Sequence, residues 1–223
     1  LLERQPLIVV WTRHSWDAVV FTIGSALGAS VVVINHNPAA LRPRGGVAGR
    51  AEALLKRMAT ITVVLAEELV EAAERESRNV MVAAHPSYLG WRERYLPVSQ
   101  TRVGSERDRR ILIVGALRPD KGADDVPEAV RAIHDHAVTV VVAGKDIPPR
   151  KWHDEVLAAG ATVEVIGSGG FIRDEALAAA LDDADVLIAP YVGATQSGSV
   201  ILALTCGVPV IAYRVGGLTS IVN

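Results

Sequence analysis

Two cationic side chains, Arg118 and Lys121, stand three residues apart in the segment that runs from Gly115 to Gly122. This segment directly follows the apolar run 111–114, which predicts a buried strand. Loops at the carboxyl ends of parallel strands commonly bind ligands. An arginine fork beside a lysine point charge can neutralise a diphosphate. A solvated turn is the alternative, because Pro-Asp and Lys-Gly are also common in turns.

A second predicted anion site is the polar stretch between the apolar run 186–189 and an apolar helical segment. The stretch consists of Thr195, Gln196, Ser197, Gly198 and Ser199. A helix that begins there presents unpaired backbone N–H groups and the positive end of its dipole, which suit a phosphate group. With the two cations, it predicts a cradle for a nucleoside diphosphate.

His36 follows the apolar run 30–34 and lies within the sequence Asn-His-Asn-Pro. A histidine at a strand end can contact a ligand or transfer a proton. It can equally hydrogen-bond a turn, and the sequence leaves both alternatives open. The other histidines show no carboxylate or cysteine pattern typical of metal ligation, so we predict no metal site.

Short Val- and Ile-rich runs alternate with helical patterns along the whole chain, which predicts an α/β protein with parallel sheets. The expected strands are 7–11, 30–34, 61–65, 80–83, 111–114, 138–143, 162–166, 186–189 and 208–212. The expected helices are 17–27, 48–59, 67–75, 126–135, 153–159, 174–181 and 199–206.

A polar, charged stretch at 89–110 has no hydrophobic period and predicts a surface connection between two domains. We therefore expect one domain at 1–98 and a second at 99–223, with four or five strands each. Two Rossmann-like halves would face a cleft between the carboxyl ends of their sheets.

Composition narrows the function classes. The formal net charge of −2 argues against nucleic acid as a partner. The single cysteine, Cys206, excludes an internal disulfide and fits a reducing compartment such as the cytoplasm. No apolar run reaches the ~18 uncharged residues of a membrane span. A group of basic residues could contact the anionic inner surface of a membrane, although the favoured interpretation is that these side chains are simply solvated. This group comprises Arg42, Arg44, Arg50, Lys56 and Arg57.

The ends of the sequence predict an internal piece of a longer protein. Leu1 is not an initiator methionine, and no leader pattern follows it. The chain stops at Asn223 just as a new helix is expected to begin after Gly217.

The second half resembles the donor-nucleotide domain of retaining GT-B glycosyltransferases of the family 4 type. The matching elements are Gly115, Arg118 and Lys121-Gly122, then Gly144, Gly170-Phe171-Ile172, Asp174-Glu175, Asp185-Val186 with Pro190, Gly207-Val208-Pro209 and Gly216-Gly217. The first half is more weakly similar to the later portion of that family's acceptor domain, which would make the N-terminal domain incomplete. The resemblance implies a GT-B fold with both ends truncated.

This resemblance also implies an activity, the transfer of a sugar from a nucleoside diphosphate sugar to an acceptor hydroxyl, with retention and without a metal. Arg118 and Lys121 would neutralise the leaving diphosphate, and His36 would contact the donor sugar. Backbone around Phe171 and Ile172 would hold the base. A glycan or lipid-linked acceptor in cell-envelope biosynthesis is expected.

Three positions depart from the family's pattern of acidic residues. Ala194, Leu202 and Ser220 stand where carboxylates are expected to hold the ribose and sugar hydroxyls. A degenerate, non-catalytic subunit that binds a nucleotide or a partner is therefore an alternative. A sugar-nucleotide 2-epimerase shares the two-domain plan but ranks lower, because its histidine and acidic set is not evident.

Overall fold

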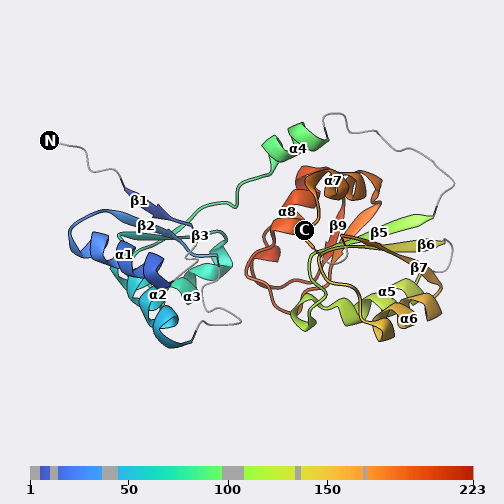
Figure 1. Ribbon diagram of the computed structural model, residues 1–223, viewed down its shortest axis with the longest axis horizontal. Coiled ribbons are helices and arrows are strands. Elements are labelled where there is room, and N and C mark those ends of the chain that lie inside the picture. Colours follow the sequence, from blue (N-terminus) through green and yellow to red (C-terminus); the bar gives the residue numbers. More distant parts are fainter. Residues whose placement is uncertain are drawn as a thin grey trace. The chain divides into compact units, whose positions relative to one another are not determined.

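The computed structural model describes residues 6–10, 15–36, 45–96, 108–133, 137–167 and 170–222. It divides into two compact units, Leu1–His85 and Pro86–Asn223 (Figure 1). The division falls before the polar stretch 89–110, whereas the sequence analysis placed it after residue 98.

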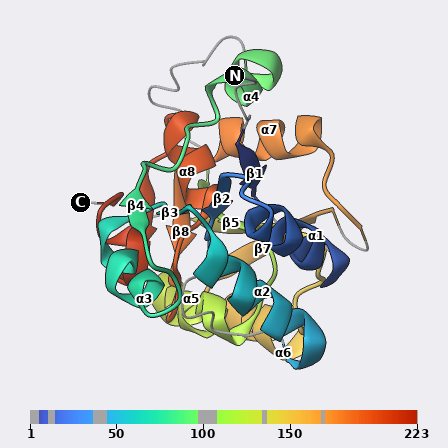
Figure 2. The same ribbon diagram turned by 90° about the vertical axis from the view of Figure 1, so that its left-hand side faces the viewer.

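The N-terminal unit is built on a parallel sheet in the order β1-β2-β3-β4. Its strands are β1 (Leu7–Val9), β2 (Val31–Ile34), β3 (Ile61–Val64) and β4 (Val80–Val82). Helices α1 (Ser15–Ala26) and α2 (Gly46–Met58) pack side by side, as Figure 2 shows. Their apolar side chains join Val9, Val31 and Val33 in one core cluster. A short 3-10 turn, η1 (Glu67–Leu69), and helix α3 (Val70–Glu74) pack near β3 and β4.

The C-terminal unit contains a parallel sheet in the order β7-β6-β5-β8-β9. The strands are β5 (Arg109–Val114), β6 (Val138–Ala143), β7 (Ala161–Ile166), β8 (Val186–Ala189) and β9 (Val210–Ala212). The central strand β5 thus has β6 on one side and β8 on the other. The chain crosses between these two sides after β7, which makes the carboxyl ends of β5 and β8 a topological switch point.

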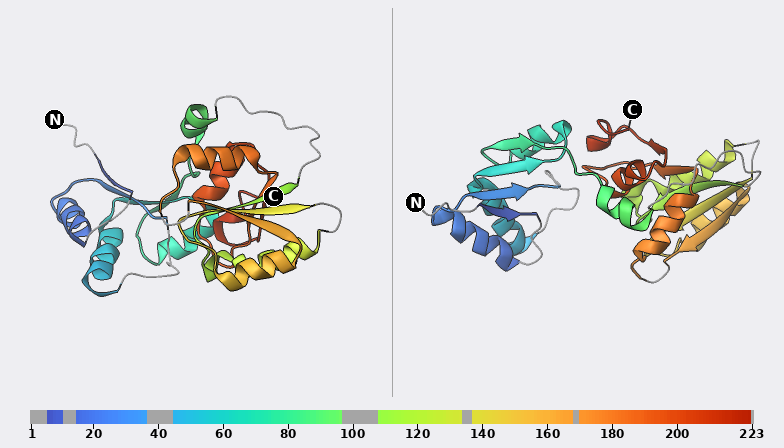
Figure 3. Two further views of the ribbon diagram at one scale, coloured as in Figure 1. Left: turned by 45° about the vertical axis from the view of Figure 1, so that its right-hand side comes forward. Right: turned by 90° about the horizontal axis from the view of Figure 1, so that it is seen from above.

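Helices cover both faces of this sheet (Figure 3). One face packs against α5 (Val126–Arg131) and α6 (Arg150–Ala158), and the other against α7 (Asp174–Asp183) and α8 (Gly198–Thr205). In β5, Ile111 and Ile113 join the first core and Leu112 the second. Burial on both faces explains why the strands read as nearly continuous apolar runs. The predicted parallel α/β class is confirmed, and all nine expected strands are present among the described residues.

One helix was missed, because its sequence is charged. Helix α4 (Leu89–Tyr95) lies in the stretch that was predicted as an irregular connection. The Trp91 indole donates a hydrogen bond from Nε1 to Asp174 Oδ1 at 3.1 Å, and its ring lies 5.1 Å from that of Tyr95. The hydrogen bond fastens α4 to α7 and explains why this segment belongs to the C-terminal unit, whereas the ring contact lies within α4. Tertiary contacts here override a weak local pattern.

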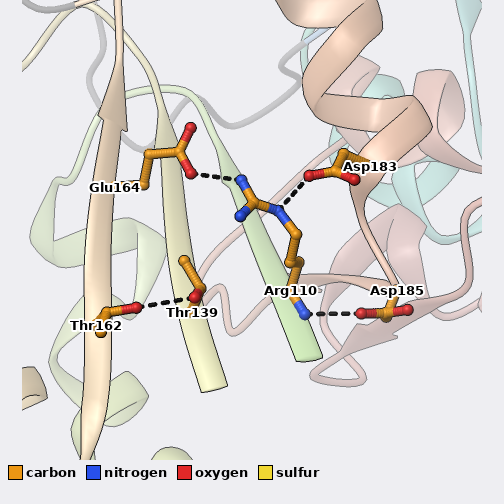
Figure 4. A network of polar contacts seen from close by, with 6 residues as sticks. All are labelled: Arg110, Thr139, Thr162, Glu164, Asp183 and Asp185. Carbon is orange, nitrogen blue, oxygen red and sulfur yellow. Dashed lines mark hydrogen bonds and ion pairs between the residues drawn. The ribbon is translucent and has the colours of Figure 1, made fainter. Parts of the chain in front are cut away.

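At its amino end the second sheet is held by a charged network (Figure 4). The backbone N–H of Arg110 donates to Asp185 Oδ2 at 2.7 Å. The Arg110 guanidinium pairs with Glu164 on β7 and with Asp183 at the end of α7. Nearby, the hydroxyls of Thr139 and Thr162 share a hydrogen bond of 2.8 Å between β6 and β7. The polar groups at this end fasten strands to one another, which leaves the opposite, carboxyl end for ligand chemistry.

Candidate functional site

The loop after β5 carries the two predicted cations. Its 3-10 turn η2 (Pro119–Lys121) is flanked by Arg118 and by Gly122. Arg118 donates from Nε and Nη2 to the two carboxylate oxygens of Asp120, at 2.9 and 2.7 Å. These hydrogen bonds raise the pKa of the Arg118 guanidinium above its ordinary value. The guanidinium is therefore held in one orientation at the carboxyl end of the central strand.

Gly122 brings this loop against the segment that follows β8. Its φ is +61°, and a Cβ there would lie 1.6 Å from the carbonyl oxygen of Pro190. Only glycine permits such a backbone approach in that conformation. Pro190 is followed by Tyr191, and the ammonium of Lys121 lies 3.6 Å from the centroid of the Tyr191 ring. The close approach thus places a lysine on an aromatic face.

The predicted helix start is confirmed within one residue. Helix α8 begins at Gly198, and Ser197 is its N-cap, with its hydroxyl accepting from the backbone N–H of Val200 at 3.4 Å. The Ser197 and Ser199 hydroxyls share a hydrogen bond of 2.9 Å. Tyr191 Oη lies 3.1 Å from Ser199 Oγ and accepts from Ser197 Oγ at 3.4 Å. The first turn of α8 is therefore tied to the residue beneath Lys121.

Thr195 and Gln196 precede this helix and are held from the other side. The N–H of Gly217 donates to the Thr195 carbonyl at 3.2 Å. A Cβ on Gly216 would lie 1.8 Å from the Ala194 carbonyl oxygen. The Gly-Gly pair after β9, which forms the 3-10 turn η4 (Gly216–Leu218), therefore fixes the backbone that leads into α8.

The loops after β5, β6 and β7 also stack closely. A Cβ on Gly144 would lie 2.2 Å from the Gly115 carbonyl oxygen, and one on Gly167 would lie 2.4 Å from Ile172 Cγ1. Ile172 packs against the core cluster of α7 and α8. Phe171 beside it is 98% exposed. The structure thus places Gly115 and Ile172 among the packed loops and leaves the Phe171 side chain in solvent.

The positions where carboxylates were expected have other roles in the packing. Leu202 is buried in the core cluster beside α8. Ala194 contributes its carbonyl to the contact with Gly216, and the Ser220 hydroxyl donates to the Gly217 carbonyl at 3.2 Å. A carboxylate that could hold ribose hydroxyls is therefore absent from these three positions.

His36 lies in the N-terminal unit, directly after β2. Burial lowers the pKa of this imidazole below 6.5, and the charge of His85 lowers it further. The preceding residue, Asn35, is buried and donates from Nδ2 to Glu76 Oε2 at 3.1 Å. Glu76 also accepts from Lys56 Nζ at 2.9 Å. His36 is thus a half-buried histidine with a lowered pKa, next in sequence to a residue of a partly buried polar network.

The basic group of the N-terminal unit does not form one solvated face. Lys56 is buried and pairs with Glu76 and with Glu52, whereas Arg50 and Arg57 are exposed. Arg42 and Arg44 lie outside the described residues. The interpretation of Lys56 as a solvated side chain was therefore wrong, because its ammonium neutralises two carboxylates.

Two residues near the cations were missed by the sequence analysis. Asp120 was considered only as part of a turn, and Tyr191 was not singled out. The position of Tyr191 between Pro190 and a serine-rich helix start could have indicated its role, because a buried tyrosine hydroxyl needs hydrogen-bond partners and serines supply them.

Within the described ranges, no group of three or more His, Cys, Asp or Glu side chains could hold a metal. None of the helices in these ranges has the length and apolar character to cross a bilayer.

Sequence comparisons identify related proteins. A family model described as "Glycosyl transferases group 1" matches residues 108–223, just over half of the chain. A 2-deoxystreptamine N-acetyl-D-glucosaminyltransferase from Streptomyces fradiae is 31% identical over 151 residues, 68% of this chain. A 2-deoxystreptamine glucosyltransferase from Streptomyces kanamyceticus is 31% identical over 115 residues, 51% of this chain. The matched regions span only 31% and 30% of these relatives' own lengths.

Solved structures share the fold. A sucrose-phosphate synthase from Thermosynechococcus elongatus superimposes with a TM-score of 0.66 at 19% identity, over 92% of this chain and 55% of its own. Anabaena HepE in complex with UDP gives a TM-score of 0.70 at 14% identity, over 97% of this chain and 62% of its own. A second HepE structure holds UDP and glucose. At these identities the likeness concerns the fold alone.

Proposed function

Because the chain belongs to the group 1 glycosyl transferases, we propose that it transfers a sugar from a nucleoside diphosphate sugar to an acceptor hydroxyl, with retention at the anomeric carbon. One observation carries this proposal. The loop with Arg118 and Lys121 follows β5, the helix start with Ser197 follows β8, and these neighbouring strands end at the same edge of the sheet. Two anion-binding elements thus converge on one place.

This arrangement supports departure of a diphosphate. As the bond between the anomeric carbon and the phosphate oxygen breaks, negative charge grows on that oxygen. Arg118, Lys121 and the first N–H groups of α8 are proposed to stabilise the growing charge. We expect no metal requirement, since the protein's own cations and amides supply this charge.

The substrates are proposed more broadly. The HepE complexes contain UDP, which makes a uridine nucleotide the first donor to test. A glycan or lipid-linked acceptor follows from the family resemblance. The names of the two Streptomyces relatives add 2-deoxystreptamine as an acceptor to include. Phe171, Ile172 and Gly115 are proposed to lie along the nucleoside, and His36 to contact the donor sugar.

A nucleotide panel tests the site. UDP, GDP, ADP and their sugar conjugates are added to the protein and its thermal unfolding is followed. A ligand at ~100 times its Kd stabilises the native state by about 2.7 kcal/mol. We expect one base to raise the Tm and the substitution Arg118→Ala to abolish the shift. Arg131→Ala is the matched control, because Arg131 is exposed at the last turn of α5, toward the amino end of the sheet.

The non-catalytic alternative is favoured by the absence of carboxylates at Ala194, Leu202 and Ser220. The double substitution of Arg118 and Lys121 by alanine separates the two functions. A transferase loses most of its kcat, whereas a binding subunit that uses another surface keeps its partner affinity. No Tm shift with any nucleotide, from a protein that unfolds cooperatively, would overturn the proposed donor site.

A further inference from the structure

We propose that Tyr191 is a positioning residue of the donor site, which holds the Lys121 ammonium and the first turn of α8 in one arrangement. This inference rests on the proposed function, because Lys121 and α8 are the diphosphate-binding elements there. Tyr191 belongs to neither anion-binding element and does not itself contact the phosphates. Its effect is exerted through the groups on either side of its ring.

The face of the Tyr191 ring holds the Lys121 ammonium. Tyr191 is 3% exposed, and the Lys121 ammonium lies 3.6 Å from its ring centroid. The negative face of an aromatic ring attracts a cation, and more strongly when water is excluded. A free lysine side chain samples many rotamers, and ordering it on binding costs about 0.5–1.5 kcal/mol. The ring therefore restricts the conformations of the Lys121 side chain before a diphosphate binds.

The Tyr191 hydroxyl holds the first turn of α8. A buried tyrosine hydroxyl requires partners, and here they are Ser199 Oγ at 3.1 Å and Ser197 Oγ at 3.4 Å. Ser197 is also the N-cap of α8. A rotation of the Tyr191 ring would therefore disturb both the cation and the helix start. One side chain thus links two anion-binding elements that lie more than seventy positions apart in sequence.

The backbone keeps this ring in place. Gly122 follows Lys121 and Pro190 precedes Tyr191, and the Gly122 backbone lies directly against the Pro190 carbonyl. The loop that carries the lysine and the segment that carries the tyrosine are therefore locked at adjacent residues. The ring covers one side of the ammonium, so its N–H groups on the other side are available to a phosphate oxygen.

Calorimetric titration with UDP, GDP and ADP, each beside its own nucleoside, tests the inference. For the nucleotide that binds the wild-type protein, Tyr191→Leu is expected to lower the affinity for the diphosphate about tenfold, which corresponds to a loss of ~1.4 kcal/mol. Tyr191→Phe keeps the ring and is expected to weaken it only about threefold. Affinity for the nucleoside is expected to change less than twofold in both variants, because it lacks the phosphates.

Two controls separate positioning from loss of stability. In a Lys121→Met background, Tyr191→Leu is expected to weaken diphosphate binding only about threefold, since the cation is gone and only the hydroxyl contacts with α8 remain to be lost. Val156→Ala removes a fully buried side chain from the opposite core and is expected to lower the Tm without changing affinity. In the wild type, the side-chain methylene protons of Lys121 are expected to shift upfield in NMR spectra because of the Tyr191 ring current.

The outcomes are distinct. If a nucleoside diphosphate binds the wild type and Tyr191→Leu binds it equally well, the inference is overturned and the proposed function stands. Equal weakening of nucleoside and diphosphate would also overturn it, because the effect would then be structural. If no nucleotide binds the wild type, the proposed function and this inference both fall, whatever the proton shifts of Lys121.

Discussion

Within each unit, the loops at the carboxyl end of the sheet are held in place, but by different kinds of contact in the two units. In the C-terminal unit, glycines allow backbone to touch backbone, as Gly122 does with Pro190 and Gly216 with Ala194. In the N-terminal unit, the end of β2 is held by polar side chains, with Glu76 joining the buried Asn35 to the buried Lys56. In the C-terminal unit the Lys121 ammonium lies on an aromatic ring and Arg118 pairs with Asp120, whereas in the N-terminal unit Lys56 pairs with two carboxylates. The first design suits an anion site, and the second suits a scaffold.

The largest effect is expected where backbone meets backbone. Gly122→Ala places a Cβ 1.6 Å from the Pro190 carbonyl oxygen and requires a φ of +61° that alanine disfavours. We expect a loss of about 3 kcal/mol or more in the free energy of unfolding, together with loss of nucleotide binding. Chemical denaturation measures the first and calorimetry the second.

Gly90→Ala is the control for this substitution. Gly90 lies within α4 and an added Cβ meets nothing within 4 Å. Alanine there is expected to stabilise the protein slightly, since it is a better helix former. Equal stabilities of the two variants would contradict the close approach of the two loops.

A smaller effect is expected in the N-terminal unit. Glu76→Ala removes the partner of Lys56, whose side chain is only 11% exposed. We expect a loss of about 2 kcal/mol, because a partly buried ammonium then lacks one of its two carboxylates. Glu71 makes an ion pair with Arg75 at side-chain exposures of 83% and 71%, so Glu71→Ala should change stability by less than ~0.5 kcal/mol. Similar losses in both variants would show that burial does not distinguish the pairs.

The smallest effect concerns pH. The pKa of His36 is lowered from 6.5 in the folded protein, so the unfolded chain takes up this proton first as the pH falls. Stability is therefore unaffected by His36 above pH 6.5 and decreases as the pH falls from 6.5 through the folded-state pKa. His36→Asn should remove that part of the slope. NMR titration of the imidazole measures its pKa directly, and a value of 6.5 or higher would contradict the prediction.

Much of the fold was predictable because the strands are buried on both faces. The run Val138–Ala143 is apolar at nearly every position, and both its ends were predicted as the structure has them. The start of α8 was predictable from its serines, since Ser197 is a favoured N-cap residue. Helix α4 could not be predicted, because Trp91 and Tyr95 stabilise it through contacts with each other and with α7.

The site was predictable in part. The positions of Arg118 and Lys121 after a strand indicated where cations would lie, but their partners depend on folding. Asp120 binds the arginine, and Tyr191 lies under the lysine from a different loop. The role proposed for Tyr191 depends on β8 lying next to β5 in the sheet. This strand order cannot be read from the sequence around either residue. A local stretch of sequence shows residue types and spacings, but it does not show which distant loops lie next to each other in the fold.

The place of β5 between β6 and β8 has a consequence for the order of folding. Strands β5, β6 and β7 follow one another in the chain and can pair early, whereas β8 must return across the sheet to reach β5. Pairings between distant segments form slowly because a long loop must close. Until β8 arrives, Lys121 has no aromatic face and α8 has no neighbouring cations. If a nucleotide binds this unit, it is therefore expected to bind only completely folded molecules. The amount of bound nucleotide would then measure the fraction of chains that have completed folding.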